Sequence, residues 1–165
     1  MKVLKFIILG IFFLYFQIIW GRYFSINRII PNFLLGYLFV TSIKLELKFT
    51  LTIAFFLGLM YDVSQPNSLG FCTISFVLIA NFVNRFHHNI HKENFFVIFL
   101  SILLISAFYI LLNLAFQLFT VENPRFSINS IIFSFVYFTV VNLIISLILL
   151  FIDQLGISFN ASSGK

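Results

Sequence analysis

Asp62 is the residue with the clearest chemical potential in this chain, because its carboxylate follows a long apolar run. It lies one helical turn after Gly58 in the stretch FLGLMYDVSQPNSLGF, and a turn containing Pro66 comes next. A carboxylate in apolar surroundings needs hydrogen-bond donors, and a glycine on the same helical face lets another helix approach closely. We predict an ordered corner in which Asp62 accepts hydrogen bonds from amides within residues 64–68, and Gly70 lets the next helix begin tightly packed. A solvated loop aspartate is the alternative.

Three histidines form the second group whose spacing could support chemistry. His87 and His91 are four residues apart and His88 lies between them, a spacing that can place two imidazoles on one helical face for a metal ion. Arg85 and Lys92 flank this cluster, and their positive charges oppose a bound cation. We interpret these histidines as solvated residues near the membrane surface and predict no metal site.

Asparagines recur inside the apolar segments and could join helices. An amide side chain in a bilayer gains roughly 0.6 to 2 kcal/mol from a hydrogen bond to another helix. We expect such bonds, in preference to a polar substrate path, because the long C-terminal apolar segments have no central charge. The residues concerned are Asn81, Asn84, Asn113 and Asn142.

No catalytic motif is recognisable in the sequence. The chain contains neither a G-x-S-x-G nucleophile turn, nor an H-E-x-x-H zinc motif, nor the glycines of a phosphate-binding loop. We therefore predict a protein that is not an enzyme and uses no cofactor.

The composition predicts an integral membrane protein. Of the 165 residues, 61% are hydrophobic and 9% are charged, and the mean hydropathy is +1.10, whereas soluble domains carry about 25% charged residues. A soluble fold of this length could not bury so much apolar surface, so membrane lipid must surround it. The net charge of +5 comes from scattered single residues, which argues against nucleic acid as a partner because no basic run could neutralise several phosphates.

Six apolar segments predict about six transmembrane helices in an all-α protein. The segments are Val3–Trp20, Asn32–Ile43 opened by Pro31, Phe49–Tyr61, Leu69 to about Asn84, Phe95–Phe119 and Ile128–Ile152. The second and third contain only about a dozen residues each, short of the roughly 20 that cross a bilayer. Two short tilted helices with snorkelling lysines are favoured, and a re-entrant hairpin over residues 32–61 is the alternative.

The basic residues orient this arrangement. With six spans and a cytoplasmic N-terminus, seven of the ten lysines and arginines fall on the cytoplasmic side, as the positive-inside rule requires. The cytoplasmic set is Lys2, Lys5, Lys44, Lys48, Arg85, Lys92 and Lys165, and the outer set is Arg22, Arg28 and Arg125. We therefore expect one membrane domain over residues 1–158 with both termini cytoplasmic, followed by a disordered tail over residues 159–165.

Three short motifs resemble those of the rod shape-determining protein MreD family. They are Pro31–Phe33 at the start of the second segment, Gly58–Asp62 at the end of the third, and Leu69–Phe71 at the entry to the fourth. Two departures occur: Asn32 stands where the family often has an acid, and residues 81–84 replace an exit richer in glycine and alanine. The positions marked by the resemblance are Pro31, Gly58, Asp62, Pro66, Leu69 and Gly70.

The resemblance implies a non-enzymatic scaffold of the bacterial cell-elongation complex in the inner membrane. Its partners would be the transmembrane helix and periplasmic neck of MreC, together with RodA, a class B penicillin-binding protein and MreB. The family's fold is similar to that of the substrate-binding subunits of energy-coupling-factor vitamin transporters, so such a subunit is the alternative function. The first segment offers only Gly10 among bulky residues, and this disfavours the small-residue contact by which such subunits meet their coupling partner.

Overall fold

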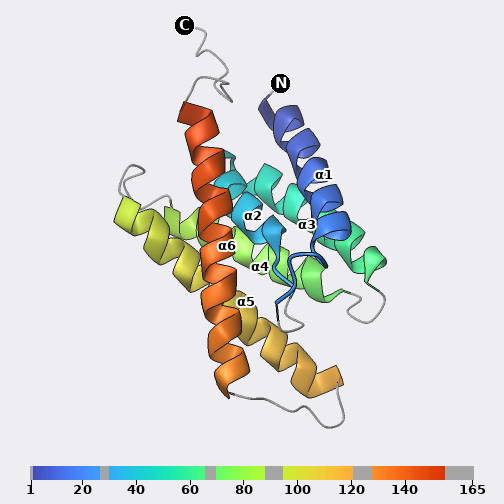
Figure 1. Ribbon diagram of the computed structural model, residues 1–165. Helices are drawn as coiled ribbons and strands as arrows, with labels where there is room; N and C mark the ends of the chain where they lie inside the picture. Colours follow the sequence, from blue (N-terminus) through green and yellow to red (C-terminus); the bar gives the residue numbers. More distant parts are fainter. Residues whose placement is uncertain (1, 27–29, 66–69, 88–94, 121–127, 155–165) are drawn as a thin grey trace, which may run out of the picture.

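The computed structural model describes residues 2–26, 30–65, 70–87, 95–120 and 128–154, and within them every regular element is an α-helix. The expected all-α membrane fold with six helices is thus confirmed. The helices are α1 (Lys2–Trp20), α2 (Phe33–Lys44), α3 (Leu47–Ser64), α4 (Phe71–His87), α5 (Phe95–Thr120) and α6 (Ile128–Gln154). The start of α1 and the end of α6 lie at the same end of the molecule (Figure 1).

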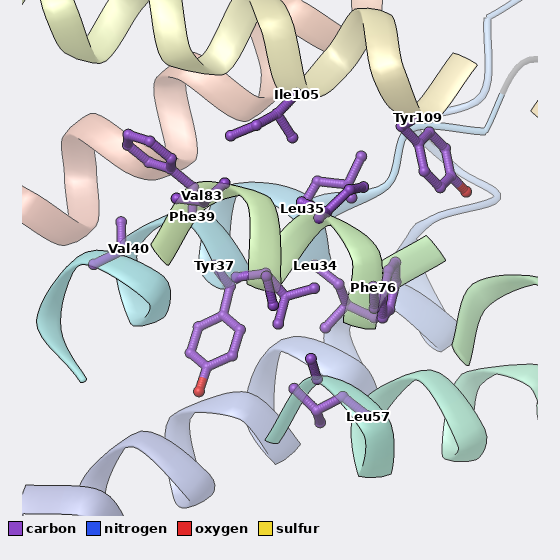
Figure 2. Packing of buried hydrophobic residues seen from close by; sticks show 14 of the residues in the cluster. Leu34, Leu35, Tyr37, Phe39, Val40, Leu57, Phe76, Val83, Ile105 and Tyr109 are labelled. Carbon is purple, nitrogen blue, oxygen red and sulfur yellow. The ribbon is translucent and has the colours of Figure 1, made fainter. Parts of the chain in front are cut away.

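Helix α2 is the core of the helix cluster. Every residue from Pro31 to Ser42 is buried, and α2 packs against each of the other five helices. Figure 2 shows Leu34 and Leu35 of α2 among Leu57 of α3, Phe76 of α4 and Ile105 of α5. A helix that is apolar on every side is stable only when neighbours cover all of its faces, which explains the central position of α2.

The other long helices carry the lipid-facing surface. Four helices contain an apolar stretch long enough to cross a membrane, namely Val3–Trp20, Leu47–Ser64, Phe96–Thr120 and Ile128–Ile152. Most of each stretch is not buried inside the protein, so hydrocarbon is the solvent that suits these surfaces. In Figure 1, α6 stands upright and α5 crosses behind it at a steep angle, where the Tyr109 and Phe138 rings meet with their centroids 5.7 Å apart.

The third segment is longer than the sequence suggested. Helix α3 has 18 residues, because it includes Lys48 near its start and Asp62 near its end. The Lys48 ammonium lies 5.2 Å from the centre of the Phe49 ring, so the lysine extends over apolar surface and allows the helix to continue. Helix α2, by contrast, has 12 residues and is only about 18 Å long. The two segments are therefore separate helices of unequal length.

Helix α2 begins at Phe33, two residues after Pro31. Asn32 is the N-cap residue and its side chain accepts a hydrogen bond from the Leu34 amide, 3.2 Å away. Pro31 precedes the cap and is fully buried, so it does not occupy the first helical turn. Asparagine is among the best N-cap residues because its side-chain oxygen satisfies a free amide, and this preference places the helix start at Phe33.

Candidate functional site

The Asp62 carboxylate caps the beginning of α4. It is 3% exposed and accepts hydrogen bonds from the Cys72 amide at 3.0 Å, the Thr73 amide at 2.8 Å and the Thr73 hydroxyl at 2.6 Å. The first amides of a helix have no partner within the helix, and a negative group there also interacts favourably with the helix dipole. Asp62 therefore holds the end of α3 to the start of α4.

The backbones of α3 and α4 touch at Gly58. A Cβ atom at this position would lie 2.5 Å from the Thr73 Cα and 2.9 Å from the Thr73 nitrogen. No side chain fits at that separation, so glycine is required for the contact. Gly58 and Asp62 thus meet the same residue of α4 from successive turns of α3. We call the five residues Gly58, Tyr61, Asp62, Cys72 and Thr73 the Asp62 corner.

Gly70 acts through its backbone conformation. Its φ angle is +85°, a left-handed value that residues with a side chain rarely adopt. A Cβ atom at Gly70 would meet no atom of the described residues within 4 Å, so the close packing at the start of α4 is made at Gly58 and Thr73. The glycine instead turns the chain immediately before α4 begins at Phe71.

The donors to Asp62 among the described residues lie farther along the chain than the sequence suggested, and residues 66–68 of the expected set lie outside those residues. We predicted amides within residues 64–68, but the donors lie on α4, ten and eleven residues after Asp62. The Gln65 amide bonds to the Asp62 backbone carbonyl, as is usual at a helix end. Pro66 and Leu69 lie outside the described residues.

Gln17 is a second buried polar residue, and the sequence reasoning missed it. Its amide nitrogen donates to the Pro31 carbonyl at 2.8 Å and to the Tyr61 hydroxyl at 3.2 Å, and its oxygen accepts from the Phe33 amide at 2.7 Å. One side chain thereby joins α1, the start of α2 and the Asp62 corner. The available signal was a single amide residue in the apolar run that follows Lys5 in the first span.

Asn32 extends this polar network to α5. Besides capping α2, it donates from its amide nitrogen to the Tyr109 hydroxyl at 3.1 Å. Gln17 contacts Tyr61, which directly precedes Asp62 in α3, and Asp62 in turn bonds to the start of α4. The polar residues at one end of the helix cluster therefore form a connected set that reaches five helices, α1 to α5.

Among the four asparagines expected to join helices, Asn84 does so. It donates to the Ser42 and Leu45 carbonyls at 2.8 and 3.0 Å, so it caps the C-terminal end of α2 from α4. Asn81 and Asn113 accept hydrogen bonds from residues of their own helices. Asn142 is buried without a partner among the described residues.

The chemistry of this site is structural. Each carboxylate or amide group in the connected set bonds to a helix end or to a tyrosine hydroxyl, so its hydrogen-bonding capacity is directed inward. Within the described ranges, no three His, Cys, Asp or Glu side chains are grouped as a metal site requires. Of the histidine cluster, His88 and His91 lie outside those ranges.

Comparison with known proteins identifies the family. The family model described as rod shape-determining protein MreD matches residues 1–155 of the 165. Neither the curated proteins nor the solved structures gave a significant match. The matched range contains all six helices, with the Asp62 corner inside it. This membrane protein therefore belongs to the MreD family and takes part in rod shape determination.

Proposed function

We propose that this chain is a non-enzymatic scaffold of the bacterial cell-elongation complex. It lies in the inner membrane with both termini in the cytoplasm. It binds the transmembrane helix and periplasmic neck of MreC and helps to position RodA, a class B penicillin-binding protein and MreB. Family membership supports a role in cell shape, and the finer assignment of partners is our proposal.

The observation that carries this proposal is the connected polar set around the Asp62 corner. Gln17, Asn32 and Asp62 are each at most 3% exposed, and their hydrogen bonds connect helices to one another. Because buried hydrogen bonds in low-dielectric surroundings favour one arrangement strongly, these contacts make the helix cluster rigid. A rigid cluster with its polar groups directed inward is suited to presenting fixed outer faces to other membrane proteins.

Helix α1 offers one such outer face. Its residues Ile8, Phe12 and Tyr15 are 61 to 67% exposed, and they recur at helical spacing on one side. Transmembrane helices associate by close packing of such surfaces. A single-span partner such as MreC would bring a helix of matching chemistry, and lipid would cover the faces that remain free.

The positions of the helix ends support this proposed orientation. The start of α1 and the end of α6 share one end of the molecule (Figure 1). Lys44 and Arg85 also share one end, because Asn84 bonds to the Ser42 carbonyl beside the α2–α3 connection. The positive-inside rule assigns this basic end to the cytoplasm.

Affinity copurification from mild detergent tests the proposal. The tagged chain is expressed with its native neighbours, and the recovered proteins are identified and quantified by mass spectrometry. We expect MreC at a fixed ratio to the tagged chain. The variant Asp62→Ala should recover less MreC while still inserting into the membrane, because α3 and α4 lose their connection.

Thr52→Val is the matched control for this experiment. Thr52 lies on the same helix, is exposed and bonds only to the Lys48 carbonyl of its own helix, so MreC recovery should be unchanged. Recovery of an ATPase pair and a bound vitamin, with no single-span elongation protein, would instead identify a substrate-binding subunit of a vitamin transporter and would refute the scaffold proposal.

A further inference from the structure

Three buried polar side chains of α5 and α6 have no hydrogen-bond partner among the described residues. The atoms concerned are the Ser106 Oγ, the Thr139 Oγ1 and both polar atoms of the Asn142 side chain. Their side chains are 0%, 8% and 2% exposed. Buried polar groups in proteins are nearly always hydrogen-bonded to protein or to ordered water, so this cluster requires an explanation.

Helix geometry indicates that the three residues lie on the same side of the α5–α6 crossing. Tyr109 of α5 meets Phe138 of α6 there, and the two helices run in opposite directions (Figure 1). One turn back along α5 leads from Tyr109 to Ser106, and one turn forward along α6 leads from Phe138 to Asn142. Thr139 is three residues before Asn142 and therefore shares its helical face.

Helix α2 contacts α6 beside Asn142 but gives the Asn142 side chain no hydrogen bond. A Cβ atom at Gly36 of α2 would lie 3.0 Å from the Asn142 backbone carbonyl, so α2 and α6 are in close contact here. The Gly36 carbonyl already accepts a hydrogen bond from Ser146 at 3.3 Å. The contact with α2 is thus made by the Asn142 backbone and by Ser146.

The Ser106 and Thr139 hydroxyls lack the hydrogen bond that other serine and threonine hydroxyls of this chain make within their own helix. Thr41, Ser42 and Ser134 each donate to the carbonyl four residues earlier in their own helix. Ser106 and Thr139 make no such bond, although the same carbonyls exist in their helices. Their hydroxyl groups therefore remain available to a separate hydrogen-bonding group.

We propose that this cluster binds water inside the helix cluster, at the α5–α6 crossing. A buried water molecule typically makes two to four hydrogen bonds. The amide nitrogen of Asn142 donates, its oxygen accepts, and the Ser106 and Thr139 hydroxyls can do either. The set is uncharged and lies near the middle of α5 and α6, where a neutral ligand costs less than an ion. This inference is independent of the scaffold proposal, because it concerns the interior of the chain.

Magnetisation transfer from water to the asparagine amides tests the proposal directly. The full-length protein is labelled with ¹⁵N-asparagine, reconstituted in lipid nanodiscs and examined by NMR. The variant Asn142→Leu serves to assign the Asn142 signal. Asn32 is the internal control, because it is equally buried at 2% exposed and its amide nitrogen donates to Tyr109. We expect strong transfer to Asn142 and weak transfer to Asn32.

Two further variants test the assigned partners. Ser106→Ala should lower transfer to Asn142 by roughly twofold, because one group that holds the water is lost. Ser134→Ala should leave the transfer unchanged, because Ser134 lies on α6 but bonds only to the Ser130 carbonyl.

Absent transfer to Asn142 in folded wild-type protein, or equal transfer to Asn142 and Asn32, would overturn the proposal. A shift of the Asn142 signal when Na⁺ replaces K⁺ would identify a cation and would overturn it too.

Discussion

Removing the Asp62 carboxylate should destabilise the protein by about 3 to 5 kcal/mol. In Asp62→Ala the Cys72 and Thr73 amides lose the acceptor that lies 3.0 and 2.8 Å away, and the Thr73 hydroxyl loses its acceptor at 2.6 Å. Each buried donor left without a partner costs about 1 to 3 kcal/mol. The lower half of that range applies to each amide, because both are at a helix end. The lost hydroxyl bond adds about 1 kcal/mol.

Two milder substitutions divide this loss into its parts. Thr73→Val removes only the hydroxyl donor and should cost about 1 kcal/mol. Asp62→Asn retains one acceptor oxygen and places an amide group near a second donor, so its cost should fall between those of the other two variants. Both substitutions nearly preserve side-chain volume, which limits the contribution from altered packing.

Equilibrium unfolding of the purified protein in mixed micelles measures these differences. Helix content, followed by circular dichroism against increasing SDS, gives a free energy of unfolding for each variant. The expected order of stability is wild type, Thr73→Val, Asp62→Asn, then Asp62→Ala. If Asp62→Ala unfolds within 1 kcal/mol of wild type, or if Thr73→Val costs as much as Asp62→Ala, the carboxylate is not the cap of α4 and our reasoning fails.

Three further predictions concern other parts of the chain. Gly58→Ala should force α3 and α4 apart and cost about 2 to 3 kcal/mol in the same unfolding assay, and wild-type stability would contradict the close backbone contact. Gln17→Leu should leave the Phe33 amide without its acceptor and cost about 2 kcal/mol; a neutral result would mean that water replaces the glutamine. A reporter active only in the cytoplasm should be active at the C-terminus and inactive when fused after Glu122, and the opposite pattern would reverse the proposed orientation.

Local sequence pattern was sufficient to predict the helices and to single out Asp62. The apolar runs between polar turns gave six helices whose bounds agree with the structure to within a few residues over most of the chain. The bounds of α3 and α4 differ most, by two to three residues at each end, and in α3 the reason is that Lys48 and Asp62 lie inside the helix. Helix bounds predicted from hydropathy stop too early at charged residues. A lysine can remain in the helix by snorkelling, and an aspartate can remain by accepting hydrogen bonds from another helix.

The tertiary partners of the polar side chains could not be predicted in this way. Gln17 bonds to Phe33 and Tyr61, and Asn32 bonds to Tyr109, which is 77 residues away. Such pairs depend on which helix faces pack together, and several packings of the same apolar helices would suit their hydropathy equally well. Periodicity within one segment carries no information about that choice.

The sequence by itself determined that this protein dissolves in lipid, that it is helical and that it resembles the MreD family, because composition, segment length and short motifs are local properties. Only the tertiary structure decided that α2 is buried on all sides, that Asp62 caps α4, and that Asn142 is buried with no partner among the described residues. The physical reason is that hydrogen bonds between helices are short-ranged and directional. Their partners are therefore fixed by the packing of the whole cluster.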